Sequence, residues 1–174
     1  MTELPRRSVL KAIGSAGAML TLGGVGVAGA REGASADQTL VDLAIAVNEP
    51  GGAFAGEFDV LIAALVANPD LLATLDGRRG QYTVFAPDDD AFDAAGFDPS
   101  NADQIPADVL EYHVTRGRRY SDSVLGAPRL RMLNGGFVTQ DGGVLNDGQA
   151  TITDTDFEAS NGVLHVISGV LLED

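Results

Sequence analysis

The sequence contains no cysteine, no tryptophan and a single lysine, Lys11. The lack of cysteine excludes disulfides, thiolate metal sites, a cysteine nucleophile and a lipid-modified N-terminal cysteine. With 174 residues, the chain is long enough for one domain with a sizeable core. It is too short for two domains of ordinary size once the first 30 residues, described below as a leader, are set aside. Packing alone must therefore stabilise this domain.

Positive charge is scarce relative to negative charge. The formal net charge is −14, and beyond residue 30 the chain carries eight cations, all arginine, against 24 anions. Such a surface repels nucleic acid and anionic lipid headgroups. Molar salt shortens the Debye length to about 3 Å, which removes most of the self-repulsion of a compact acidic chain. We therefore expect an acidic protein from a halophilic source, with its acidic residues solvated. A surface that binds cations or basic partners is the alternative.

The first 30 residues have the features of an export signal. Arg6 and Arg7 precede an Ala/Gly-rich apolar stretch that ends Ala28-Gly29-Ala30. This pattern is typical of twin-arginine (Tat) export with cleavage after Ala30, and the many glycines disfavour a stable membrane-spanning helix. An uncleaved N-terminal anchor is the alternative. The predicted division is a signal peptide over residues 1–30, a linker over 31–37 and one domain over 38–174.

Helical periodicity dominates the first half of this domain. Residues 39–47 predict a helix with its apolar positions on one face, and a second helical stripe begins at Phe58. That stripe consists of Phe58, Leu61, Ile62, Leu65 and Val66. Asn68-Pro69 ends it and starts a third helix. Asn68 is the expected N-cap, and Pro69 takes the first helical position, where a missing amide hydrogen costs nothing.

A strand and a capped helix are expected next. Residues 81–86 alternate and include aromatic and β-branched side chains, which predicts a strand closed by Pro87. The three aspartates that follow, Asp88 to Asp90, are open to a metal-site interpretation. Helix capping is favoured, because the Asp88 carboxylate can accept hydrogen bonds at a helix N-terminus. Asp89 and Asp90 would then meet the positive end of the helix dipole.

The second half has the composition of strands. Pro106 predicts the start of a helix that runs through Val114, and short apolar runs separated by Gly and Asn/Asp turns follow Arg116. Residues 162–167 are apolar enough for a central strand and 170–172 for a further one. Helices first and strands later indicate an α+β fold. The predicted turns are Asn134-Gly135-Gly136, Asp141-Gly142-Gly143 and Asn146-Asp147-Gly148.

Three separated segments together resemble the fasciclin domain family. The first is Tyr82-Thr83-Val84-Phe85-Ala86-Pro87-Asp88-Asp89-Asp90-Ala91-Phe92, which resembles the first sequence box of the family. The second box is matched by Asn161-Gly162-Val163-Leu164-His165-Val166-Ile167, and the Tyr-His segment between the boxes by Leu110-Glu111-Tyr112-His113-Val114. Departures are small: Asp88 stands where threonine is usual, and Ser168 where aspartate often follows the second box.

The resemblance implies a wedge of β-strands with several helices packed around it. It also implies export to the cell surface or the extracellular medium, and adhesion or matrix binding. By the same resemblance, Tyr112 and His113 are the first candidates for a partner contact surface. The alternative for Tyr112 is a packed ring with a hydrogen-bonded hydroxyl, which is the usual state of a buried tyrosine and is favoured here.

No recognisable catalytic set is present. The chain has two histidines, His113 and His165, and lacks Gly-x-Ser-x-Gly, His-Glu-x-x-His, phosphate-loop and dinucleotide motifs. His165 alternates with apolar neighbours in a predicted strand, which favours a structural histidine. Asp154, Asp156 and Glu158 alternate and are expected to form an acidic strip on one strand face. A weak, unspecific divalent-cation site is one interpretation of this strip, and solvated charge is favoured. The sequence therefore predicts a non-enzymatic protein without cofactor or metal.

Three functions are open at this point. The first is an exported adhesion or binding module whose partner is an envelope glycoprotein, a polysaccharide or a neighbouring cell. The second is a carrier for a small apolar ligand, a pigment or a lipid, held in a pocket between helices and sheet. The third is a hydrolase dependent on His113 or His165.

Overall fold

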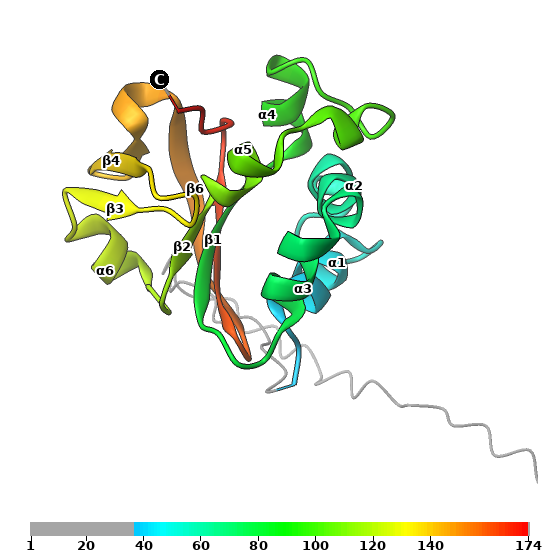
Figure 1. Ribbon diagram of the computed structural model, residues 1–174, viewed down its shortest axis with the longest axis horizontal. Coiled ribbons are helices and arrows are strands. Elements are labelled where there is room, and N and C mark those ends of the chain that lie inside the picture. Colours follow the sequence, from blue (N-terminus) through cyan, green and yellow to red (C-terminus); the bar gives the residue numbers. More distant parts are fainter. Residues whose placement is uncertain (1–36, 174) are drawn as a thin grey trace, which may run out of the picture.

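The computed structural model describes residues 37–173, which form one α+β unit (Figure 1). The predicted α+β class is confirmed, since helices pack against a mixed seven-stranded sheet. Arg6, Arg7 and the predicted cleavage position after Ala30 lie outside the described residues. Within residues 37–173, no helix is both long and apolar enough to cross a membrane.

The sheet has the strand order β2-β1-β7-β6-β5-β4-β3. The neighbouring strands β1 and β7 are parallel, and every other neighbouring pair is antiparallel. The strands are β1 (Tyr82–Pro87), β2 (Val114–Arg116), β3 (Arg129–Arg131), β4 (Phe137–Asp141), β5 (Val144–Leu145), β6 (Ala150–Ala159) and β7 (Gly162–Ile167). The helices are α1 (Leu40–Asn48), α2 (Asp59–Ala67), α3 (Pro69–Asp76), α4 (Asp89–Ala94), α5 (Ala107–Glu111) and α6 (Ser121–Leu125), with 3-10 turns η1 (Ala102–Gln104) and η2 (Asn146–Gly148).

The two ends of the sheet meet. An isolated antiparallel bridge joins Thr115 of β2 to Met132, just beyond β3. The Leu133 amide donates to the Val114 carbonyl over 2.7 Å, and the Thr115 hydroxyl donates to the Arg131 carbonyl over 2.7 Å. The sheet is therefore strongly curled, and β3 lies beside β2 (Figure 1).

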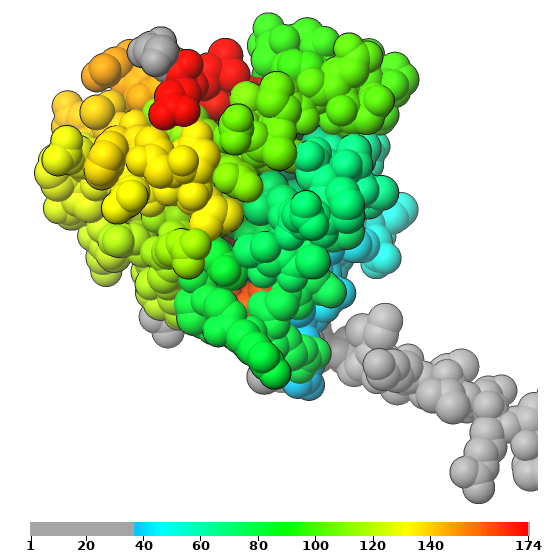
Figure 2. Space-filling view, viewed as in Figure 1, coloured from blue at the N-terminus to red at the C-terminus, as the bar shows by residue number. Residues whose placement is uncertain are grey.

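Apolar clusters cover both faces of the central strands. Val84 and Leu164 belong to a cluster shared with the helices, and Phe85 and Ile167 belong to a second cluster shared with β3, β4, β5 and α6. Figure 2 shows the helical segments, cyan to green, packed closely beside the yellow and orange strand segments. Because β7 is buried along its whole length, the prediction of a central strand there is confirmed.

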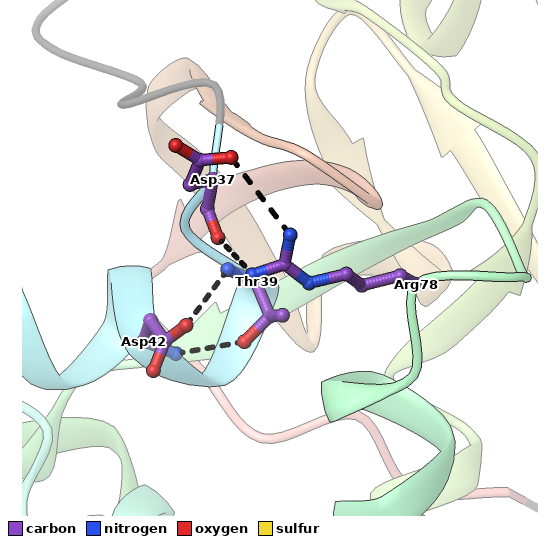
Figure 3. A network of polar contacts seen from close by, with 4 residues as sticks. All are labelled: Asp37, Thr39, Asp42 and Arg78. Carbon is purple, nitrogen blue, oxygen red and sulfur yellow. Dashed lines mark hydrogen bonds and ion pairs between the residues drawn. The ribbon is translucent and has the colours of Figure 1, made fainter.

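Helix α1 begins at a capping box, which confirms the predicted first helix. The Thr39 hydroxyl accepts from the Asp42 amide over 3.2 Å, and the Asp42 carboxylate accepts from the Thr39 amide over 3.1 Å. This reciprocal pair satisfies two amides that a helix start leaves without partners. Figure 3 shows Arg78 reaching from beyond α3 to the Asp37 carbonyl beside this box, over 2.9 Å.

Helix α2 buries most of the predicted face, since Phe58, Leu61 and Leu65 lie in the core. Val66 was expected in the core but is 65% exposed, because the helix turns Val60 and Ala64 inward beside Leu61 and Leu65. Asn68 takes the predicted N-cap position of α3, which begins at Pro69, but its side chain makes no capping hydrogen bond to that helix. Its side chain donates backward to the Ala64 carbonyl over 2.8 Å and so closes α2 instead of opening α3.

Three elements of the second half differ from prediction. The helix after Pro106 ends at Glu111 and not at Val114, because Val114 pairs with Val84 in the sheet. Helix α6 was not predicted. Residues 170–172 form no strand, since the Leu171 and Leu172 amides are satisfied by the side chains of His113 and Gln149. The three predicted turns are confirmed and connect β3 to β4, β4 to β5 and β5 to β6.

Candidate functional site

Tyr112 and His113, the predicted partner-contact residues, are both buried. Tyr112 is 2% exposed, and its hydroxyl donates to the Phe137 carbonyl over 2.7 Å. A Cβ at Gly136 would lie 2.9 Å from the Tyr112 ring, so the turn before β4 packs directly on that ring. These contacts support the packing interpretation of Tyr112. A direct contact of either side chain with a partner remains a prediction.

His113 uses both ring nitrogens inside the protein. Nδ1 donates to the Val109 carbonyl over 2.7 Å, and Nε2 accepts from the Leu171 amide over 2.9 Å. Only the neutral ring can donate at one nitrogen and accept at the other. Burial lowers the pKa of His113 to about 4, although the bond to Val109 opposes this shift. The ring therefore has no free lone pair with which to act as a base.

His165 is held in the same manner on the other side of the sheet. Nε2 donates to the Arg119 carbonyl over 2.9 Å, Nδ1 accepts from the Asp156 amide over 3.2 Å, and the ring stacks on Phe85. Burial lowers the pKa of His165, while the bond to Arg119 and the charge of Asp156 act in the opposite direction. The predicted role of His165 as a satisfied structural histidine is confirmed.

Two of the three aspartates after β1 cap helices, each a different one. Asp88 accepts from the Ala91 amide over 2.8 Å and caps α4, as predicted. Asp89 reaches outside its own helix and accepts from the Asp59 and Val60 amides over 3.2 and 3.0 Å, which caps α2. Burial raises the pKa of Asp89 against the lowering effect of these two bonds. Within residues 37–173, no group of three or more His, Asp or Glu side chains is placed to hold a metal.

The alternating acids of β6 do not form a regular strip. Two register shifts interrupt the pairing of β6 with β7, one on each side of Asp154. At the second shift Asp156 takes a positive φ of 67°, and its carboxylate accepts from the Ser121 amide and hydroxyl over 2.7 and 2.6 Å. Asp156 therefore anchors the start of α6.

Asn161 and Gly162, at the start of the second box, join the helices to the sheet. The Asn161 side chain is fully buried, accepts from the Leu40 amide over 2.8 Å and donates to the Leu75 and Gly77 carbonyls over 2.6 and 2.9 Å. A Cβ at Gly162 would lie 2.1 Å from the Tyr82 carbonyl oxygen, so glycine is required where β7 meets β1. Sequence reasoning gave neither residue a role. The available signals were an Asn-Gly pair directly before a buried strand and the place of that pair in the second box.

The space between helices and sheet is small. The cavity there has a volume of about 20 Å³ and is lined by apolar side chains and His113. A volume of this size holds about one water molecule, whereas ligand pockets usually measure about 300 Å³ or more. The geometry gives no support to the predicted carrier of a pigment or lipid.

The fold and these contacts define a class of protein: a scaffold whose sequence boxes hold the sheet and helices together. The chain belongs to the fasciclin family, since the Fasciclin domain model matches residues 56–173. This match confirms the resemblance drawn from the three sequence segments. Membership of this family does not point to a catalytic role.

Individual relatives cover about the same share of the chain. Protein sll1483 of Synechocystis sp. is 37% identical over 124 residues, which are 66% of this chain and 67% of that protein. Transforming growth factor-beta-induced protein ig-h3 of Sus scrofa is 33% identical over 121 residues, 66% of this chain but 17% of the relative's length. A solved FAS1 domain pair from the insect cell adhesion molecule fasciclin I is 20% identical over 65% of this chain and 46% of its own, with a TM-score of 0.49.

Proposed function

We propose that this protein is an exported binding or adhesion module without catalytic activity, which works at the cell surface or in the extracellular medium. The observation that carries the proposal is the fasciclin domain match over residues 56–173. Two further features support it. The first 30 residues have a twin-arginine pattern, and both imidazoles are engaged at both nitrogens by the backbone.

The proposed partners are an envelope glycoprotein, a polysaccharide or the surface of a neighbouring cell. Nucleic acid is excluded as a partner class because the net charge of −14 repels a polyanionic duplex. Since Tyr112 is buried against the turn before β4, we propose that it contributes to adhesion by positioning that turn. His113 is also buried and holds the segment after β7, so we propose that it supports the scaffold. Direct contact would require these segments to open.

Deletion of the gene in its native host tests this proposal. We expect attachment or cell aggregation in multimolar salt to fall, and the wild-type gene to restore it. The matched control is the gene with Arg6→Lys and Arg7→Lys, which keeps the leader's charge but removes the twin-arginine pair. This control should leave the protein inside the cell and fail to restore attachment. Unchanged attachment in the deletion strain would argue against an adhesive role.

A further inference from the structure

A basic hollow lies where the two ends of the curled sheet meet. It has a volume of about 400 Å³ and is lined by Thr115, Arg116, Arg119, Arg131, Met132, Leu133 and Gly135. Three of these seven residues are arginine and none is acidic, in a chain with 25 acidic residues and a net charge of −14. The hollow is therefore a local reversal of the charge of the whole molecule.

Two of the arginines are placed opposite each other by the strand register. The bridge between Thr115 and Met132 is antiparallel, so the next position along brings Arg116 opposite Arg131. Both residues are exposed and both line the hollow. Like charges directly opposite on paired strands are destabilising, so this pair weakens the closure of the sheet unless an anion lies between them.

The third arginine carries an unsatisfied group. The backbone of Arg119 is fixed on both sides: its amide donates to the Thr83 hydroxyl over 2.8 Å and its carbonyl accepts from His165 Nε2 over 2.9 Å. Its side-chain Nε is buried and has no hydrogen-bond partner among the described residues. A buried donor without a partner loses its hydration without compensation, which makes such a group exceptional in a folded protein.

The arginines of the hollow also have no carboxylate partner within the part of the chain that the structure describes. Among residues 37–173, the only ion pair joins Arg78 to Asp37, on another part of the surface. Neighbouring Arg118 differs from them, because its guanidinium donates to Gln81 and to the Ala159 and Ser160 carbonyls. The guanidinium groups of the hollow are thus available to a ligand, whereas that of Arg118 holds the β6–β7 turn.

We propose that Arg116, Arg119 and Arg131 bind a carboxylate or sulfate group carried by an acidic polysaccharide. The inference rests on the proposed function and names the chemistry of the partner. A guanidinium offers two parallel N–H donors that match the two oxygens of such a group. An isolated hollow on an otherwise acidic surface accepts one anionic sugar at a time and repels the continuous charge of a duplex or a membrane. Direct contacts of this kind persist in salt that screens long-range attraction.

Calorimetric titration of the purified full-length chain in multimolar salt tests this site. The probes are an oligogalacturonate, a sulfated oligosaccharide, a neutral glucose oligomer and a DNA duplex. We expect saturable binding of one or both acidic sugars and none of the neutral sugar or DNA. The Arg116→Gln/Arg131→Gln variant should bind the acidic sugar at least about tenfold more weakly than wild type. The affinity of Arg131→Lys should lie between these two, because lysine keeps the positive charge but lacks the two parallel N–H donors of a guanidinium. Arg79→Gln, which removes an exposed arginine elsewhere, should bind as wild type does.

Several outcomes would overturn the site. They are no saturable binding by wild type, equal loss in Arg79→Gln, equal binding by the double variant, or preference for DNA. Thermal melting of each variant shows that it is folded, and the double variant should melt no lower than wild type in dilute salt because it removes a repulsion. A deletion strain whose attachment is restored by the Arg116→Gln/Arg131→Gln gene would reject this site and leave the proposed function standing.

Discussion

At the scale of single residues, the two imidazoles act as structural crosslinks. His113 joins α5 to the segment after β7 across 58 positions of sequence, and His165 joins β7 to the loop before α6 across 46. Each ring donates at one nitrogen and accepts at the other, which a protonated ring cannot do. Their protonation is therefore coupled to unfolding.

The pH dependence of stability follows from His113. Its pKa is about 4 in the folded protein, whereas an imidazole in the unfolded chain has its ordinary pKa of 6.5, so the unfolded chain binds the proton first as pH falls. The stabilisation is complete above pH 6.5 and is lost progressively toward pH 4. Between about pH 7.5 and pH 5, wild type should lose about 2 kcal/mol more unfolding free energy than His113→Gln.

Denaturant unfolding of both proteins at several pH values measures this difference. His165 is present in both proteins, so its contribution cancels in the comparison. The lower limit of about pH 5 lies above the usual titration range of carboxylates. Parallel pH profiles for the two proteins would show that the His113 ring is not held neutral by the fold.

At the scale of elements, sequence patterns correctly predicted the helices, caps and turns that depend on short-range interactions. The first helix, the cap at Asp88 and the three glycine turns follow from short-range periodicity and turn chemistry, and all are present. The errors lie where distant segments compete with local preference. Val114 leaves a helical pattern to pair with Val84, and Leu171 gives its amide to His113 instead of to a strand.

The candidate site was also predicted only in its local features. Sequence reasoning correctly expected the structural role of His165 but not its hydrogen-bond partners. The loop after β2 brings Arg119 to the ring, and the bulged pairing of β6 brings Asp156. The basic hollow could not be foreseen at all. It exists only because β2 and β3 close the sheet, which no periodicity in the sequence encodes.

Asp89 offers a test of coupling between elements. Asp89→Ala removes the acceptors of two amides at the start of α2 and should lower the unfolding free energy by about 1 kcal/mol. Asp89→Asn should cost less, since it keeps one acceptor and removes a partly buried charge. The control is Asp90→Ala, whose side chain is exposed and caps neither helix. Equal losses at positions 89 and 90, measured by urea unfolding, would reject the cap.

At the scale of the whole molecule, charge governs stability. The net charge is −14, and within residues 37–173 the one ion pair, Arg78 with Asp37, has side chains 64% and 90% exposed. Exposed ion pairs contribute little to stability, so added salt weakens almost no favourable attraction. Its main effect is to screen the repulsion between the many acidic side chains. We propose that the protein is adapted to a very salty exterior. Its melting temperature should rise steadily from dilute to multimolar KCl, and a flat or falling profile would reject halophilic adaptation.

The central claim is that the sequence boxes build a scaffold and that its outer surface binds. The most direct measurement is attachment by the deletion strain complemented with His113→Gln, normalised to the amount of folded protein at the surface. The account predicts a less stable and less abundant protein that supports wild-type attachment per folded molecule. A variant that is as stable and abundant as wild type but fails to support attachment would contradict it.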